Sequence, residues 1–148
     1  MSTGLLHTHS LLRYFVLILL LAVIVNSLIG WLGAKPFGKK DNKLSLFLLI
    51  SAHVQLLVGL ILYFVSSVVQ FNSETMKNAG IRYWTVEHIT GMLIAIVLIT
   101  VARSTSKRMT DDVKKHKRLA IFNIIALVVV IIVLAFSGRG ILSMSAFN

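Results

Sequence analysis

Five histidines are the residues of this sequence best suited to chemistry: His7, His9, His53, His88 and His116. An imidazole binds metal ions or moves protons near neutral pH. His53 lies in an uncharged run over 44–69, about nine residues from its start, which is roughly 13 Å along a helix. An ionisable side chain at that depth in a bilayer is costly, so we interpret His53 as a candidate functional residue.

His88 is the second candidate within an apolar run, in the segment EHITGMLIA. If its helix begins near Arg82, His88 lies roughly 9 Å from the outer end. Gly91 and Ala95 follow on the same helical face, and we expect them to leave volume beside the ring. An imidazole with small neighbours and apolar walls suits a flat, apolar ligand such as haem. The alternative is a structural histidine that bonds a serine or a carbonyl group.

His7 and His9 form an H-x-H pair at the outer mouth of the first run, and a helix would turn their rings apart. His9 and Arg13 share a face at i, i+4, and Arg13 is expected at the same depth as Arg82. The two arginines are candidates to pair with carboxylates of a ligand, haem propionates included. Alternatively they only anchor the helices at the interface. His116, inside KKHKR, is expected to be solvated.

Composition places these residues in a membrane. The chain has 148 residues, 57% of them hydrophobic, and its uncharged runs predict four transmembrane spans at 10–32, 44–68, 82–102 and 119–137 in one domain. The net charge of +10 sits in the short connections, where an orientation signal explains it better than nucleic acid does. The chain contains no cysteine, which excludes disulfides, thiolate metal sites and covalently attached haem.

The distribution of basic residues predicts the topology. Eleven Lys and Arg residues fall in the first and third connections, against four elsewhere: Arg13, Lys77, Arg82 and Arg139. Positive residues favour the cytoplasm, so we expect both termini outside and an antiparallel up-down bundle of four helices. Small and polar residues at three- and four-residue spacing predict helix contacts, as in the second-span stripe Ser51, Gln55, Gly59, Tyr63 and Ser66.

The segments LLHTHSLLRY, SLIGWLG, HVQLLVGLILYFVS, YWTVEHITGMLIAIVLIT and KKHKRLAIFNIIAL resemble a family of short four-helix bacterial membrane proteins labelled "cytochrome B". The likeness covers nearly the whole chain. It implies b-type haem ligated by histidines, which this sequence offers at His7 or His9, His53, His88 and His116, and a place in the bacterial inner (cytoplasmic) membrane. The sequence departs from diheme cytochromes because none of its helices carries two histidines two turns or more apart.

The ligand pairing stays open at this stage. On antiparallel helices His53 and His88 are offset by about 8 Å in depth. Either they share one haem on tilted helices, or each binds its own, with His9 completing the outer site.

The sequence therefore predicts a membrane electron-transfer component with non-covalent haem b of unknown number. Its expected partners are the lipid bilayer and a redox partner or quinone, within a larger complex or a homo-oligomer of a respiratory or redox assembly. The sequence has no phosphate loop, no nucleophile with a base and no paired carboxylates, so a stand-alone enzyme is the weaker interpretation. Two alternatives remain: an accessory or assembly subunit with structural histidines, and a copper- or zinc-handling protein that uses His7, His9 and methionines.

Overall fold

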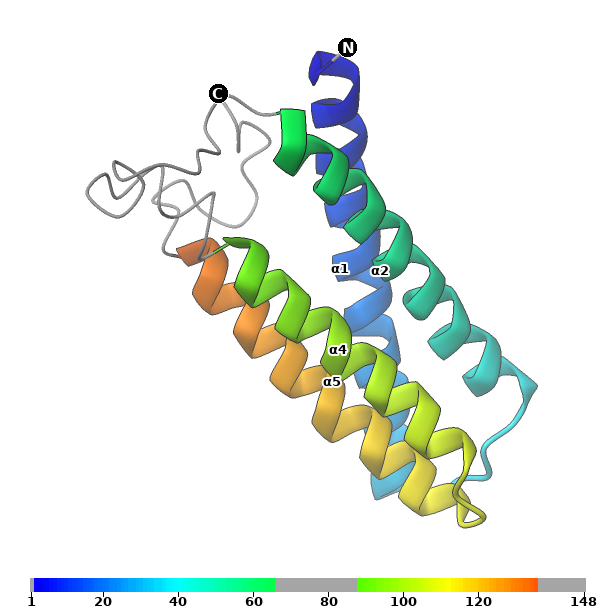
Figure 1. Ribbon diagram of the computed structural model, residues 1–148. Coiled ribbons are helices and arrows are strands. Elements are labelled where there is room, and N and C mark those ends of the chain that lie inside the picture. Colours follow the sequence, from blue (N-terminus) through cyan, green and yellow to red (C-terminus); the bar gives the residue numbers. More distant parts are fainter. Residues whose placement is uncertain (1, 66–87, 136–148) are drawn as a thin grey trace.

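The computed structural model describes residues 2–65 and 88–135, and this part of the chain forms four α-helices (Figure 1). They are α1 (Ser2–Leu32), α2 (Lys39–Val65), α4 (His88–Lys107) and α5 (Asp112–Ala135). Each is long and apolar enough to cross a membrane. The described chain is therefore all-helical, as predicted, and of multi-pass membrane type.

The helices extend beyond the predicted spans. The connection between α4 and α5 shortens to 108–111, and that between α1 and α2 to 33–38. Hydropathy detects only the part of a helix that matches the hydrocarbon layer, whereas lysine, arginine and serine residues continue the helix into the polar interface. The predicted start of the third span at Arg82 lies outside the described residues.

The turn between α1 and α2 is defined by backbone and side-chain hydrogen bonds. The N–H groups of Ala34 and Lys35 donate to the carbonyls of Trp31 and Gly30, at 3.3 and 2.9 Å, and Ala34 has a φ of 50°. This is a Schellman-type helix end with alanine at the left-handed position. Asp41, in the first turn of α2, accepts from the Gly38 N–H at 2.8 Å and so caps that helix.

Contacts between the helices fix which ends lie together. Each helix packs against two others: α1 and α4 each contact both α2 and α5. Gly59 near the end of α2 adjoins His9 near the start of α1, and Asn26 near the end of α1 donates to Asp41 at 2.6 Å. We call the end with the starts of α1 and α4 the histidine end, and the opposite end the basic end.

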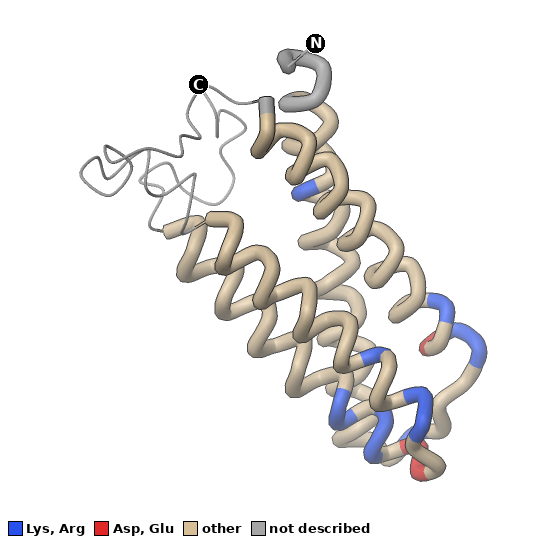
Figure 2. Tube along the Cα trace, in the orientation of Figure 1, with Lys and Arg blue, Asp and Glu red and all other residues tan. Residues whose placement is uncertain are grey.

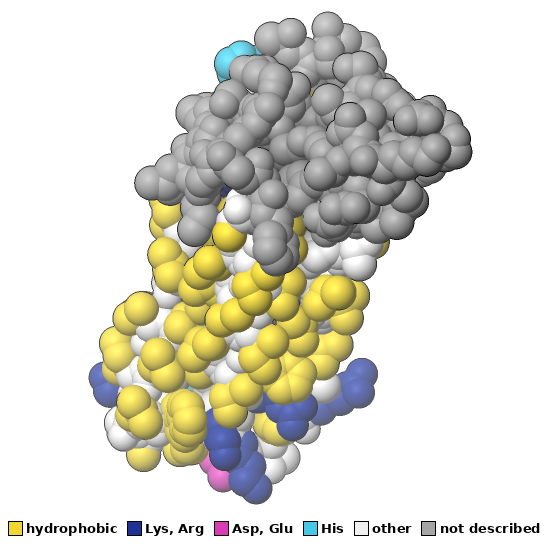
Figure 3. Space-filling view, turned by 90° about the vertical axis from the view of Figure 1, so that its left-hand side faces the viewer, with side chains coloured by type: hydrophobic (Ala, Val, Ile, Leu, Met, Phe, Trp, Pro, Cys, Tyr) yellow, Lys and Arg dark blue, Asp and Glu magenta, His cyan; other side chains and the backbone are white. Residues whose placement is uncertain are grey.

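The core of the bundle is made of aliphatic and small side chains. A central cluster contains Leu20, Val23, Ile24, Leu48, Ala52, Ala95, Ile99 and Ala126. Small residues let the backbones approach: a Cβ at Gly91 of α4 would run into Val133 of α5. The outward surface is also apolar, with residues such as Leu57 at 61% and Phe64 at 75% exposure, as expected of helices that face lipid (Figure 3).

Lysine and arginine residues gather at the basic end, and Arg13 is the described exception (Figure 2). Arg103 is buried there, and its Nη1 donates to the Asn42 carbonyl at 3.0 Å and to Ser45 Oγ at 2.6 Å. This side chain ties the last turns of α4 to the first turns of α2.

His116 corrects a prediction at the same end. The expected solvated residue is only 1% exposed: its ring lies beside Gly30 and Phe37, and Nε2 lies 3.2 Å from the Pro36 carbonyl. Because a carbonyl only accepts, Nε2 carries the proton and donates. His116 is buried because α5 begins at Asp112, which turns this position inward with Leu119, Ala120 and Asn123.

Candidate cofactor-binding cavity

A cavity lies between the helices and reaches the histidine end. All four helices contribute to its wall. Its volume is about 110 Å³. Most of the lining is aliphatic, and its polar side chains are those of His9, Arg13, Gln55, Tyr63 and His88. This composition is typical of a ligand site: apolar walls with a few polar groups.

His9 lies on α1 and faces α2. Gly59 makes room for its imidazole, because a Cβ at that position would lie 3.3 Å from His9 Cε1. One turn before Gly59, the amide Nε2 of Gln55 donates to the His9 backbone carbonyl at 3.0 Å. A small residue and an amide of α2 thus hold this turn of α1 and its ring in place.

His88 is the first residue of α4 and lies across the cavity mouth from His9. The two ring centroids are 6.5 Å apart and the ring planes are inclined by 75°. Two imidazoles bound to opposite sides of one metal ion at ~2.0 Å each would have ring centroids ~6.3 Å apart. The separation of the His9 and His88 rings is close to this value, so both imidazoles could hold one metal ion.

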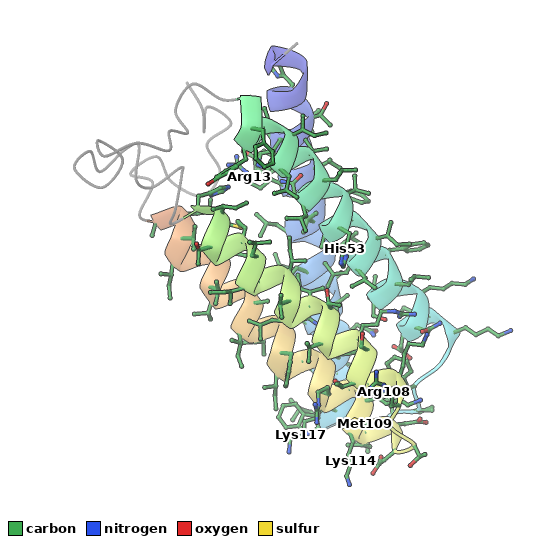
Figure 4. The ribbon with its side chains drawn as sticks, in the orientation of Figure 1. Arg13, His53, Arg108, Met109, Lys114 and Lys117 are labelled. Atoms are coloured by element: carbon green, nitrogen blue, oxygen red, sulfur yellow. The ribbon has the colours of Figure 1, made fainter. Side chains whose placement is uncertain are left out.

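Arg13 supplies positive charge to the cavity, one turn along α1 from His9. Its Nη2 donates to the Tyr14 hydroxyl at 3.3 Å, and its guanidinium lies 5.0 Å from the Tyr14 ring centroid. Among the described lining residues there is no carboxylate. In Figure 4 Arg13 lies toward the histidine end. This side of the cavity therefore favours an anionic group of a ligand.

His53 does not lie in this cavity. Its ring is exposed, and its Nδ1 donates to the Leu49 carbonyl of its own helix at 2.7 Å (Figure 4). Ile50, Leu57 and Phe64, which share its face of α2, are 50 to 75% exposed. His53 therefore lies on the exposed face of α2. A ligand role for His53 stays a prediction.

The other predicted site residues differ in their outcomes. His9 and His88 lie together with Arg13, whereas His7 is exposed on α1. Arg82 lies outside the described residues. Ala95 lines the cavity as expected, but the open side of Gly91 faces Val133 instead of the space beside His88.

Gln55 and Tyr63 line the cavity but were not among the predicted ligand-site residues. Both belong to the small-residue stripe of α2, which was predicted as a helix contact. That contact with α1 exists at Gln55 and Gly59, and the same stripe continues into the cavity wall. The stripe was thus a better indication of the cavity than His53, which lies about 200° around the helix from Gln55.

The donor set of the described cavity consists of the imidazoles of His9 and His88, with the guanidinium of Arg13 nearby. Zinc and copper sites use three or four protein ligands, and no group of three or more His, Cys, Asp or Glu residues occurs in the described ranges. A haem brings four nitrogen ligands and requires only one or two axial ligands from the protein. The pair His9 and His88, the apolar walls and Arg13 fit those requirements.

Comparisons of the chain with models of protein families, with curated proteins and with solved structures find no match.

Proposed function

We propose that this chain binds one b-type haem between His9 and His88 and passes electrons within a membrane. The observation that carries the proposal is the 6.5 Å separation of the two ring centroids at the mouth of an apolar cavity. Attachment is non-covalent, because the chain has no cysteine to form a thioether.

Each part of the cavity has a task in this proposal. The haem supplies reversible one-electron chemistry at its iron. His9 and His88 would hold the iron from two helices, and Gln55 and Gly59 keep His9 in position. Arg13 offsets the charge of a propionate, and the aliphatic walls exclude water. Burial and the imidazoles of His9 and His88 would set the reduction potential of the haem.

The membrane arrangement belongs to the same proposal. The helices form an antiparallel up-down bundle with both termini outside, and the histidine end lies at the outer surface of a bacterial inner membrane. The contacts of His9 with Gly59 and of Asn26 with Asp41 support the antiparallel course, and the basic residues opposite support the orientation. A redox partner or quinone then exchanges electrons at the histidine end, where the cavity opens.

Absorption spectroscopy tests the ligand pair. Protein purified in mild detergent from haem-replete cells should show a reducible low-spin b-type spectrum and release its haem to acid acetone. His9→Ala and His88→Ala should each abolish the spectrum or shift it to high spin, because one axial ligand is lost. His53→Ala and His116→Ala are the matched controls and should leave the spectrum unchanged, because both rings lie outside the cavity.

The contrary outcomes separate the parts of the proposal. A colourless wild-type preparation would contradict haem binding and favour an accessory subunit with structural histidines. A full low-spin spectrum in both His9→Ala and His88→Ala would contradict the ligand assignment but not haem binding. Loss of the spectrum in His53→Ala would show that the ligand set includes α2.

A further inference from the structure

A second hollow lies at the basic end, remote from His9 and His88. Its volume is about 340 Å³, and it is lined by Met109, Lys114, Lys117, Arg118, Ile121 and Phe122. Three of these six residues are cations, and none is a carboxylate. The hollow thus combines positive charge with apolar side chains.

Contacts around the hollow orient two of its cations. Arg118 lies 5.2 Å above the Phe122 ring, and its Nη1 lies 3.4 Å from the Thr105 hydroxyl of α4. Lys117 Nζ lies 5.7 Å from the Trp31 ring centroid. Because these side chains rest on aromatic rings, they lose less conformational freedom on binding an anion than free surface lysines do.

An exposed apolar strip leaves the hollow along the same face of α5. Ile125, Val128 and Ile132 follow Ile121 at three- and four-residue spacing and are 46%, 48% and 49% exposed. From Ile121 to Ile132 the strip is ~16 Å long, which matches half of a ~30 Å hydrocarbon core. Positive charge at the membrane surface with an apolar track one leaflet deep fits the two parts of a phospholipid.

We propose that this hollow binds the phosphate headgroup of one anionic phospholipid, whose acyl chain lies along Ile125, Val128 and Ile132. Lys114, Lys117 and Arg118 contact the phosphate, and Phe122 and Met109 pack against the glycerol region. The apolar strip favours a phospholipid over free phosphate, because free phosphate has no apolar part that could pack against the strip. The site does not depend on haem, since none of its residues lines the cavity of His9 and His88.

Native mass spectrometry tests the site in the full-length protein. The protein is released from micelles that contain equal amounts of phosphatidylglycerol and phosphatidylcholine with identical acyl chains. The wild type should retain one phosphatidylglycerol, favoured at least about tenfold over phosphatidylcholine, because each cation near an anionic headgroup contributes about fivefold. An excess of inorganic phosphate should not displace it. Equal retention of the two lipids, or displacement by phosphate, would overturn the proposal.

Charge-matched variants locate the lipid. The triple variant Lys114→Gln, Lys117→Gln, Arg118→Gln should lose the preference for phosphatidylglycerol. The control Lys39→Gln, Lys40→Gln, Lys43→Gln removes as many cations from exposed positions at the same end and should keep it. Equal loss in both variants would show a diffuse surface charge in place of a site. If the first variant does not fold, Lys114→Gln alone should lower the preference about fivefold.

Discussion

The side chain of His116 fills the space that Gly30 leaves on α1. A Cβ at position 30 would collide with the imidazole, and the ring is held on its other sides by Phe37 and the Pro36 carbonyl. The histidine thus joins the second turn of α5 to the end of α1 and to the loop that follows it. Its role at this place is structural.

Gly30→Ala should therefore destabilise the protein, by about 1–3 kcal/mol, because the added methyl group forces His116 out of its position. The measurement is thermal unfolding in detergent. His116→Ala is the matched background for a double-mutant cycle. In this background the ring is absent, so Gly30→Ala should lower the free energy of unfolding clearly less than it does in the wild type. Additive effects of the two substitutions would contradict a direct contact.

His53 and His9 show which parts of the site are readable from sequence. Lipid and bundle core are equally apolar, so hydropathy cannot say which face of a membrane helix points inward. The stripe of small and polar residues does indicate the inward face. Gly59 and Gln55 were correctly predicted as contact positions, and they adjoin His9. His53 shares its face with large aliphatic residues, which here lie on the outward surface.

The four helices themselves follow from sequence because each uncharged run must satisfy its backbone hydrogen bonds internally. The residues at which the helices begin and end are harder to predict from the sequence. Asp41 and Asp111 start helices among lysines by accepting backbone N–H groups, from Gly38 at 2.8 Å and from Val113 at 2.9 Å. These caps extend α2 and α5 into the region that composition alone assigns to loops, and that extension turns His116 inward.

The end of α1 carries an alanine where the backbone favours glycine. Ala34 has a φ of 50°, a conformation in which its Cβ is crowded. Ala34→Gly should raise the free energy of unfolding by about 0.5–1 kcal/mol, and Ala34→Val should lower it, because a β-branched residue resists positive φ. Thermal unfolding of the two variants shows whether the free energy of unfolding rises for Ala34→Gly and falls for Ala34→Val. A destabilising glycine would indicate that the turn relaxes elsewhere.

The whole molecule is polarised along its axis, with Arg13 as the one described cation remote from the basic end (Figure 2). The absence of cysteine from the sequence makes single-cysteine labelling unambiguous. A cysteine at His7 should react with an impermeant thiol reagent on intact cells, and one at Thr110 should react only after the membrane is opened. Both positions are exposed, so access to the reagent depends on the side of the membrane. The opposite labelling pattern would reverse the orientation.

The two imidazoles of the cavity belong to different helical hairpins. His9 comes with α1 and α2, and His88 comes with α4 and α5, whereas α1 and α4 lie diagonally across the bundle. During synthesis the first hairpin enters the membrane before the second has been translated, and it carries Gln55 and Gly59 ready to hold His9. A nascent chain with only α1 and α2 therefore has half a site. Completion of the site coincides with docking of the second hairpin, so a ligand held by both histidines would bind only the fully inserted chain.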